Sequence, residues 1–169
     1  MLDTLTIDRP EQLKALGHPL RLRVLEELGA RSESLTNREL AQRLGVDPGH
    51  LHFHVRMLQK AGLIELSDGG RRREKPYRSA AKAIRVAPEL TSAGLSGGLH
   101  AAMLDEVQRG FDKFADQGRF RGAQVTVRLP LEKARELLRE FNEKLDAAEE
   151  ESAETMIFTT FFHPPSSIE

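Results

Sequence analysis

The chain has 169 residues and a formal net charge of -1, a length that suits one ordinary domain or two small ones and excludes a large multidomain enzyme. Charged residues make up 30% of it and hydrophobic residues 39%, as in soluble globular proteins and unlike membrane or disordered ones. There is no cysteine, which excludes disulfides, thiolate nucleophiles and cysteine-bound metals. The first residues, MLDTLTIDRP, lack the basic start and apolar stretch of a signal peptide, so we expect a cytoplasmic protein that does not enter the membrane.

The charge is unevenly distributed along the chain. Residues 1–88 contain 16 Lys and Arg against 11 Asp and Glu, whereas residues 89–169 contain 9 against 15. The segment from Arg71 to Arg85 holds seven basic residues against the single acid Glu74. This split predicts that the first half contacts a polyanion and that the acidic second half has another role.

Two helical patterns open the chain. The first begins near Pro10 and pauses at residues 17–19, and the second runs from Pro19 until Gly29 ends it. In the second helix the apolar residues recur at steps of three and four, which predicts one buried stripe. We expect the charged residues between them to lie largely in solvent: Arg21, Arg23, Glu26 and Glu27.

A helix, a tight turn and a second helix follow. Thr36 and Glu39 form a capping box that opens a short helix closed by Gly45. Asp47 is a good N-cap for the next helix, with Pro48 at the permitted first position. That helix stops at residues 61–62, Ala-Gly.

A hairpin is predicted directly after this second helix. Residues 63–67 alternate as a short strand, Asp-Gly-Gly at 68–70 is a strong turn signal, and a second extended segment begins at Tyr77. The basic run therefore lies at the hairpin tip.

The second half begins after residues 88–98, which are rich in Pro, Gly and Ser and mark a boundary. We expect a helix from Leu99 to Gln117, a strand at 125–129, a helix from Pro130 to about Glu150 and a strand at 156–162. Two strands around one helix cannot bury both faces alone. A homodimer in which the first of these helices, or the sheet, meets its twin is the economical solution.

Residues 44–65, LGVDPGHLHFHVRMLQKAGLIE, resemble the helix-turn-helix of ArsR-like winged-helix repressors. LGHPLRLRVLEEL at 16–28 matches the first long helix of that family, and GGRRREKPYRS at 69–79 lies where its wing should be. The resemblance covers about residues 10–88, and the cysteine motif of the metal-sensing members is absent. A thiolate site for arsenic or cadmium is therefore excluded.

The resemblance implies an α+β fold that is mainly helical. Residues 1–88 would be a winged helix-turn-helix DNA-binding domain. For residues 89–169 the pattern of the residues themselves predicts a helix-strand-helix-strand region for dimerisation or effector binding. Seven of the eight phenylalanines lie in this second region. They suit a ligand pocket or, as we prefer, a core and dimer interface. Whether the second region binds a small-molecule effector stays open.

The helix that begins at Pro48 is the candidate reading helix. At about 3.6 residues per turn, its outward face carries His52, Phe53 and Arg56, while Leu51, Val55 and Leu58 face the core. Phe53 can pack on a thymine methyl and His52 can bond a base edge, whereas the helix N-terminus and Arg56 suit phosphates. The alternative for Phe53 is packing on the wing or a neighbouring loop. The full set of candidate DNA-binding residues is Thr36, Asn37, Pro48, Gly49, His50, His52, Phe53, Arg56, Arg71, Arg72, Arg73 and Lys75.

Without cysteine, any metal site in this sequence would need histidines and carboxylates. His50 and His54 stand four apart and could present two imidazoles to zinc, but no third ligand is evident and no H-E-x-x-H pattern is present. We therefore predict no metal and no cofactor, with His54 at the border of the core and His18 at a helix start. His100 with its neighbouring acids keeps a carboxylate-histidine site as a weak alternative.

No catalytic pattern accompanies these residues. There is no glycine-rich phosphate loop and no nucleophile with a base at recognisable spacing, so we do not expect an enzyme. The sequence favours a dimeric, sequence-specific transcriptional regulator with its reading helix in the major groove and its basic wing on the backbone or minor groove of double-stranded DNA. The alternative is a winged-helix module for sequence-indifferent DNA binding or for protein contact.

Overall fold

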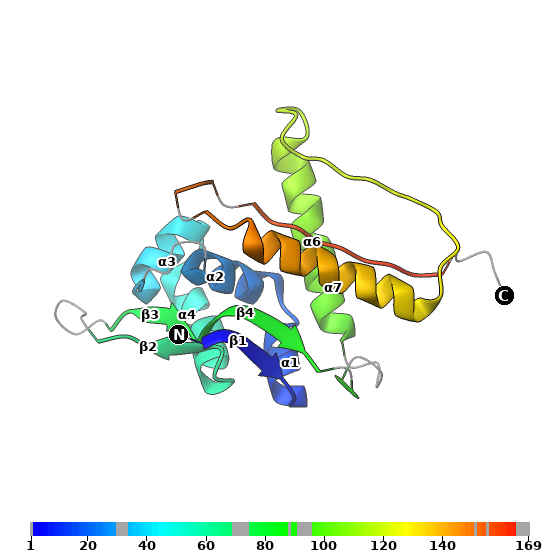
Figure 1. The fold of residues 1–169 in the computed structure, drawn as a ribbon. Helices are drawn as coiled ribbons and strands as arrows, with labels where there is room; N and C mark the ends of the chain where they lie inside the picture. Colours follow the sequence, from blue (N-terminus) through cyan, green and yellow to red (C-terminus); the bar gives the residue numbers. More distant parts are fainter. Residues whose placement is uncertain are drawn as a thin grey trace. The chain divides into compact units, whose positions relative to one another are not determined.

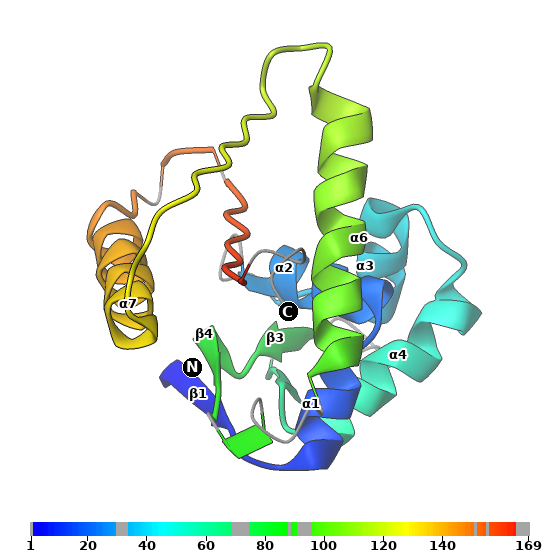
Figure 2. The same cartoon turned by 90° about the vertical axis from the view of Figure 1, so that its right-hand side faces the viewer.

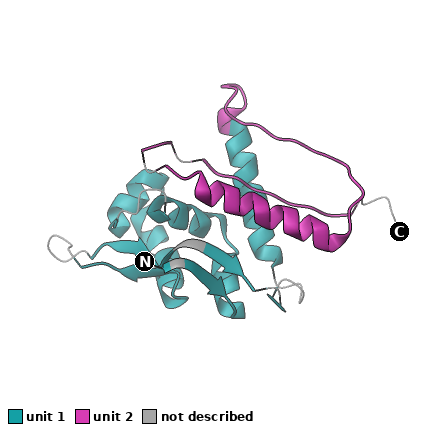
Figure 3. Cartoon of the chain, viewed as in Figure 1, with its two compact units in different colours: residues 1–112 teal, residues 113–169 magenta. Residues whose placement is uncertain are grey.

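The computed structural model describes residues 2–29, 34–68, 75–87, 89–90, 96–150, 152–154 and 156–164. Figure 3 shows its two compact units, residues 1–112 and 113–169. The described residues are mainly helical with two small sheets, which confirms the expected α+β class. A functional boundary between residues 88 and 89 stays a prediction.

Four helices in the first unit begin and end close to the positions that the sequence predicts (Figure 1). Thr36 and Glu39 form the capping box, and Gly45 closes that helix in the left-handed conformation at φ 66°. The side chain of Asp47 accepts the N–H of His50 at 2.8 Å. The bounds are α1 Pro10–Leu16, α2 Pro19–Gly29, α3 Asn37–Leu44 and α4 Pro48–Lys60.

Two two-stranded sheets complete this part of the first unit. In the predicted hairpin, β2 (Ile64–Leu66) pairs antiparallel with β3 (Tyr77–Ser79). The second sheet was not predicted: β1 (Leu2–Ile7) pairs parallel with β4 (Ala81–Val86), and the two strands lie side by side in Figures 1 and 2. The arginines at positions 71–73 fall outside the described residues.

The core of the first unit forms where the apolar stripes of the four helices meet. Leu51, Val55 and Leu58 of α4 are fully buried, as expected. They pack in one cluster with residues from the other helices and from both sheets. Burial of this kind contributes about 1.5–3 kcal/mol for each large apolar side chain, which is enough to fix how α4 is seated.

The long helix α6 (Gly97–Phe114) begins two residues before the predicted start at Leu99. Its first turn lies against the end of α1, where a Cβ on Gly98 would stand 3.3 Å from Cα of Gly17. This contact is tighter than usual for a Cβ atom, so a side chain at Gly98 would require the backbone at Gly17 to shift by a few tenths of an ångström. Ala102 is buried, but Phe111 near the C-terminus of the helix is 51% exposed.

In the second unit the helix is confirmed and the strands are not. The helix, α7 (Leu131–Ala147), carries ion pairs at helical spacing, including Lys133 with Glu136 at 2.7 Å. Neither 125–129 nor 156–162 joins a sheet among the described residues. A strand, unlike a helix, has no backbone hydrogen bonds of its own and needs a partner to form a ladder.

The phenylalanines of the second half do not form the core that we preferred. Phe111, Phe141, Phe158, Phe161 and Phe162 are all at least 36% exposed. No residue of α7 is buried. Apolar side chains of the second unit that the sequence pattern assigned to an interior therefore lie at its surface.

The prediction that Arg21 lies in solvent is wrong, because its side chain is only 6% exposed. Its Nη2 donates to the carbonyl of Lys14 at 3.0 Å and its Nε donates to the carbonyl of Ala15. Its Nη1 lies 3.5 Å from Nδ1 of His54 and 3.7 Å from the sulfur of Met57. One guanidinium thus joins the C-terminus of α1 and the inner side of α4 to α2.

His54 lies in the same polar cluster and is 4% exposed, so the expectation that it borders the core is confirmed. Its ring centroid lies 4.4 Å from that of His18 and 4.9 Å from that of His50. Burial lowers the pKa of His54 to about 4, and His18, Arg21 and His50 add to the effect. The imidazole is therefore neutral at pH 7. His18 starts α2 as expected, since its Nδ1 accepts the N–H of Leu20 at 3.1 Å.

We predict that Arg21→Met destabilises the fold by about 1–3 kcal/mol, because this is the cost of leaving the buried carbonyl of Ala15 without a donor, whereas the carbonyl of Lys14 keeps the N–H of Gly17. Urea unfolding followed by circular dichroism measures the change. Arg38→Met, an exposed position on α3, is the matched control and should change stability by less than about 0.5 kcal/mol. An Arg21→Met variant as stable as the parent would show that desolvating the charge costs as much as its hydrogen bonds contribute.

We predict that the protein loses stability as the pH falls from 6.5 towards 4 and that His54→Gln reduces this loss. The folded-state pKa of His54, about 4, is below its ordinary value of 6.5, so the unfolded chain binds more protons between these values. The stabilisation that neutral His54 gives the folded state is fully present above pH 6.5. It decreases by on the order of 3 kcal/mol as the pH falls from 6.5 to 4.

The measurement is the urea midpoint of parent and variant from pH 7 to pH 4.5. Their difference removes contributions common to both, such as that of Glu26, whose pKa burial raises. His52→Gln, an exposed change on the same helix, should keep the slope of the parent. Parallel curves for parent and His54→Gln would contradict the role given to His54.

Candidate nucleic-acid interface

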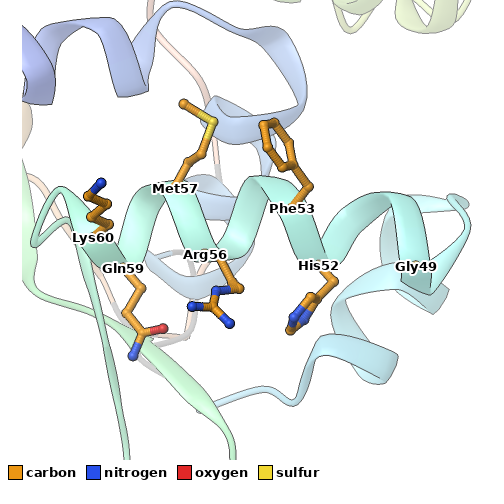
Figure 4. Close-up of a pocket in the computed structure, with 7 residues that line it drawn as sticks. All are labelled: Gly49, His52, Phe53, Arg56, Met57, Gln59 and Lys60. Atoms are coloured by element: carbon orange, nitrogen blue, oxygen red, sulfur yellow. The ribbon is translucent and has the colours of Figure 1, made fainter.

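The outward side of α4 forms a shallow, open groove (Figure 4). Phe53 and Met57 project to one side of the helix, and His52, Arg56 and Gln59 to the other. Phe53 is 63% exposed, so it is not enclosed by a neighbouring loop, although its ring meets that of His54 edge-on at 5.6 Å. The helix therefore presents an apolar flank beside a flank of hydrogen-bonding and cationic groups.

The N-terminus of α4 is already engaged by the chain's own carboxylate. Asp47 accepts the N–H of His50, and Pro48 at the first position has no N–H to offer. Gly49 is exposed, and a Cβ there would stand 3.0 Å from Oδ1 of Asp47. A phosphate at this helix end would have to lie beside a carboxylate or displace it, so the sequence expectation of an open phosphate site is weakened here.

Thr36 and Asn37 are committed to local structure. The N–H and hydroxyl of Thr36 both donate to the Glu39 carboxylate at 2.8 Å, and these hydrogen bonds lower the pKa of Glu39. Asn37 donates from Nδ2 to the carbonyl of Pro48 at 2.8 Å, which ties the start of α3 to the start of α4. Its Oδ1 is buried and has no hydrogen-bond partner among the described residues. Asn37 is thus a positioning residue for α4.

Exposed basic side chains lie on the groove and elsewhere in the helix-turn-helix and hairpin. Arg56 and Lys60 line the groove on α4, and Lys75 is exposed before β3. Arg38 on α3 is also exposed and was missed by the sequence analysis, as were Gln59 and Lys60. Their signal is helical spacing: Gln59 and Lys60 follow Arg56 at steps of three and four.

His50 and His18 both contact the ring of His54, so the structure brings three imidazoles together. The sequence spacing indicated only His50 and His54. Nevertheless, in the part of the chain that the structure describes, no three His or acidic side chains are placed to hold a metal ion. The guanidinium of Arg21 next to His54 also disfavours a cation. His100, the weak alternative, is exposed at the start of α6.

In the described ranges, no helix has the length and apolar character needed to cross a bilayer.

A comparison with protein families gives one match, a helix-turn-helix domain over residues 16–67. These residues contain α2, α3, α4 and β2. None of the curated proteins matches the chain.

Solved structures give more distant likenesses. Reduced HlyU from Vibrio cholerae N16961 is 23% identical, over 49% of this chain and 77% of that chain, with a TM-score of 0.36. Rv0081 of M. tuberculosis is 24% identical, over 57% and 88% of the two chains, with a TM-score of 0.36. The transcriptional regulator PA3341 is 22% identical, over 76% and 79%, with a TM-score of 0.33.

TM-scores this low do not add to the identification of a helix-turn-helix domain. That identification rests on the family match and on the packing of the helices. The capped turn between α3 and α4 and the buried inner face of α4 agree with that match. Residues 16–67 form a helix-turn-helix domain.

Proposed function

We propose that this chain is a dimeric, sequence-specific DNA-binding regulator of transcription. The observation that carries the proposal is the exposed side of α4 within a helix-turn-helix domain, with Phe53 63% exposed beside His52 and Arg56. Leaving a phenylalanine in water forgoes about 1.5–3 kcal/mol of burial. Packing against a thymine methyl on the floor of a major groove would recover part of it.

In the proposed complex, α4 enters the major groove. His52 and Phe53 contact base edges, and Arg56 holds a phosphate. The hairpin of β2 and β3 acts as the wing, with Lys75 and the arginines at 71–73 on the backbone or in the minor groove. Two copies would place their α4 helices about one helical turn of DNA apart, so the preferred site is an inverted repeat.

The alternatives are sequence-indifferent DNA coating and protein contact, and we favour them less. Binding to DNA phosphates alone would require only cationic side chains on α4. The outward side of α4 also carries Phe53, whose ring would gain nothing from contact with a phosphate. A small-molecule effector would act by favouring one separation of the two reading helices over another. A cytoplasmic location belongs to the same proposal.

We predict that selection from random duplex DNA with the full chain enriches a pair of inverted half-sites. Against the selected duplex, His52→Ala and Phe53→Ala should each reduce the preference over a scrambled duplex by about 5- to 100-fold. Arg56→Ala should weaken binding to both duplexes alike and lower the salt slope by roughly one unit for each phosphate that the arginine neutralises.

Arg139→Ala on α7 removes an exposed arginine from the other unit and is the matched control, expected to leave affinity and preference unchanged. Equal affinity for every duplex would replace specific recognition with coating. Absence of DNA binding at any salt concentration would leave protein contact as the role of this domain.

A further inference from the structure

The second unit contains two strand-forming segments with apolar side chains at its surface. In 125–129, Val125, Val127 and Leu129 alternate with Thr126 and Arg128 and are 76%, 60% and 44% exposed. In 156–162, MIFTTFF, Ile157 is 54% and Phe158 58% exposed. Both have the composition of strands and neither has a ladder among the described residues.

The two strand-forming segments have the same orientation. In Figures 1 and 2 the segment after α6 and the segment near the C-terminus run in the same direction, and α7, which connects them in sequence, runs back. The ring of Phe141 on α7 meets the ring of Phe158 edge-on at 6.0 Å. The helix therefore lies against one face of 156–162, as a crossover helix does against its sheet.

The exposed apolar surface approaches the size that an interface needs. Phe141, Phe158 and Phe162 are 36%, 58% and 47% exposed, which for phenylalanine leaves roughly 300 Å² in water. The exposed aliphatic residues of the two strand-forming segments add a comparable area. A monomer exposes a patch of a few hundred Å², while each partner of a standard interface buries about 800 Å².

The two segments differ in where they belong in a sheet. The segment 156–162 carries apolar residues on both faces, Phe158 and Phe162 on one and Ile157 on the other, which is typical of a central strand. The segment 125–129 has the charged Arg128 on one face, which is typical of an edge strand. Within the described part of one chain, no strand is hydrogen-bonded to segment 156–162, so the neighbour that a central strand needs is missing there.

We propose that a second copy of this chain supplies that neighbour. Segments 156–162 of the two copies pair antiparallel across a two-fold axis, and segment 125–129 of each copy flanks them, so that one four-stranded sheet spans the dimer. A two-fold axis perpendicular to the sheet makes two copies of one strand antiparallel. This inference rests on the dimer proposed above and identifies its interface.

The absence of cysteine allows a direct test by disulfide crosslinking of the full chain. Each position from 157 to 161 is changed singly to cysteine, with Thr159→Cys at the centre of the segment. Residues opposite each other in an antiparallel pair have Cα atoms about 4.5–5.5 Å apart, within the range a disulfide spans. We expect one central position to form a band of twice the monomer mass under mild oxidation, at least tenfold more than positions two residues away.

Thr126→Cys in the edge strand is the matched control and should give little crosslinked product, and circular dichroism checks that each variant folds. Mass in solution and binding to the selected duplex are measured alongside. A dimer that binds the duplex without a crosslinking maximum overturns this interface and leaves the proposed function standing. A monomer overturns both the interface and the proposed dimer, whereas crosslinking without DNA binding supports the interface and rejects the regulator.

Discussion

The guanidinium of Arg21 is buried where three helices of the first unit meet. A buried charge is tolerated only when its hydrogen bonds are made. Among the described residues, its acceptors at the end of α1 are the carbonyl of Lys14, which also accepts the N–H of Gly17, and the carbonyl of Ala15. The negative end of the α1 dipole compensates part of the charge. Because one side chain contacts both helices, the position of the C-terminus of α1 and the position of α4 depend on each other.

That coupling explains why α4 has two chemically different sides. On the inner side, Arg21 and burial keep the imidazole of His54 neutral, because a proton there would add a second positive charge to a poorly solvated site. On the outer side, Phe53 and Arg56 meet solvent. Asn37 fixes the start of the same helix through the carbonyl of Pro48. The outward side chains are thus presented from a helix that is held at its start and along its inner side.

Local chemistry was sufficient to predict the helices of the first unit. Thr36, Asp47 and Pro48 act within one turn of the helix they start, so a short stretch of sequence contains their whole effect. The burial of Arg21 and the pairing of β1 with β4 could not be obtained in this way. The first depends on where α1 ends in space, and the second joins Leu2 to Ala81. The same holds in the candidate interface for the hydrogen bond of Asn37 to Pro48.

The second unit separates two kinds of sequence signal. The apolar spacing and ion pairs of α7 predict a helix that closes its own hydrogen bonds, and the helix is present without a buried face. Alternation at 125–129 and the strand-forming composition of 156–162 predict side chains that would suit a sheet, but they cannot supply the neighbouring strand. Strand pairing depends on chain elsewhere, in this copy or another. A strand-like pattern therefore predicts that a segment suits a sheet but not which strand it pairs with. A helical pattern with caps predicts a structure whose backbone hydrogen bonds all lie within the segment.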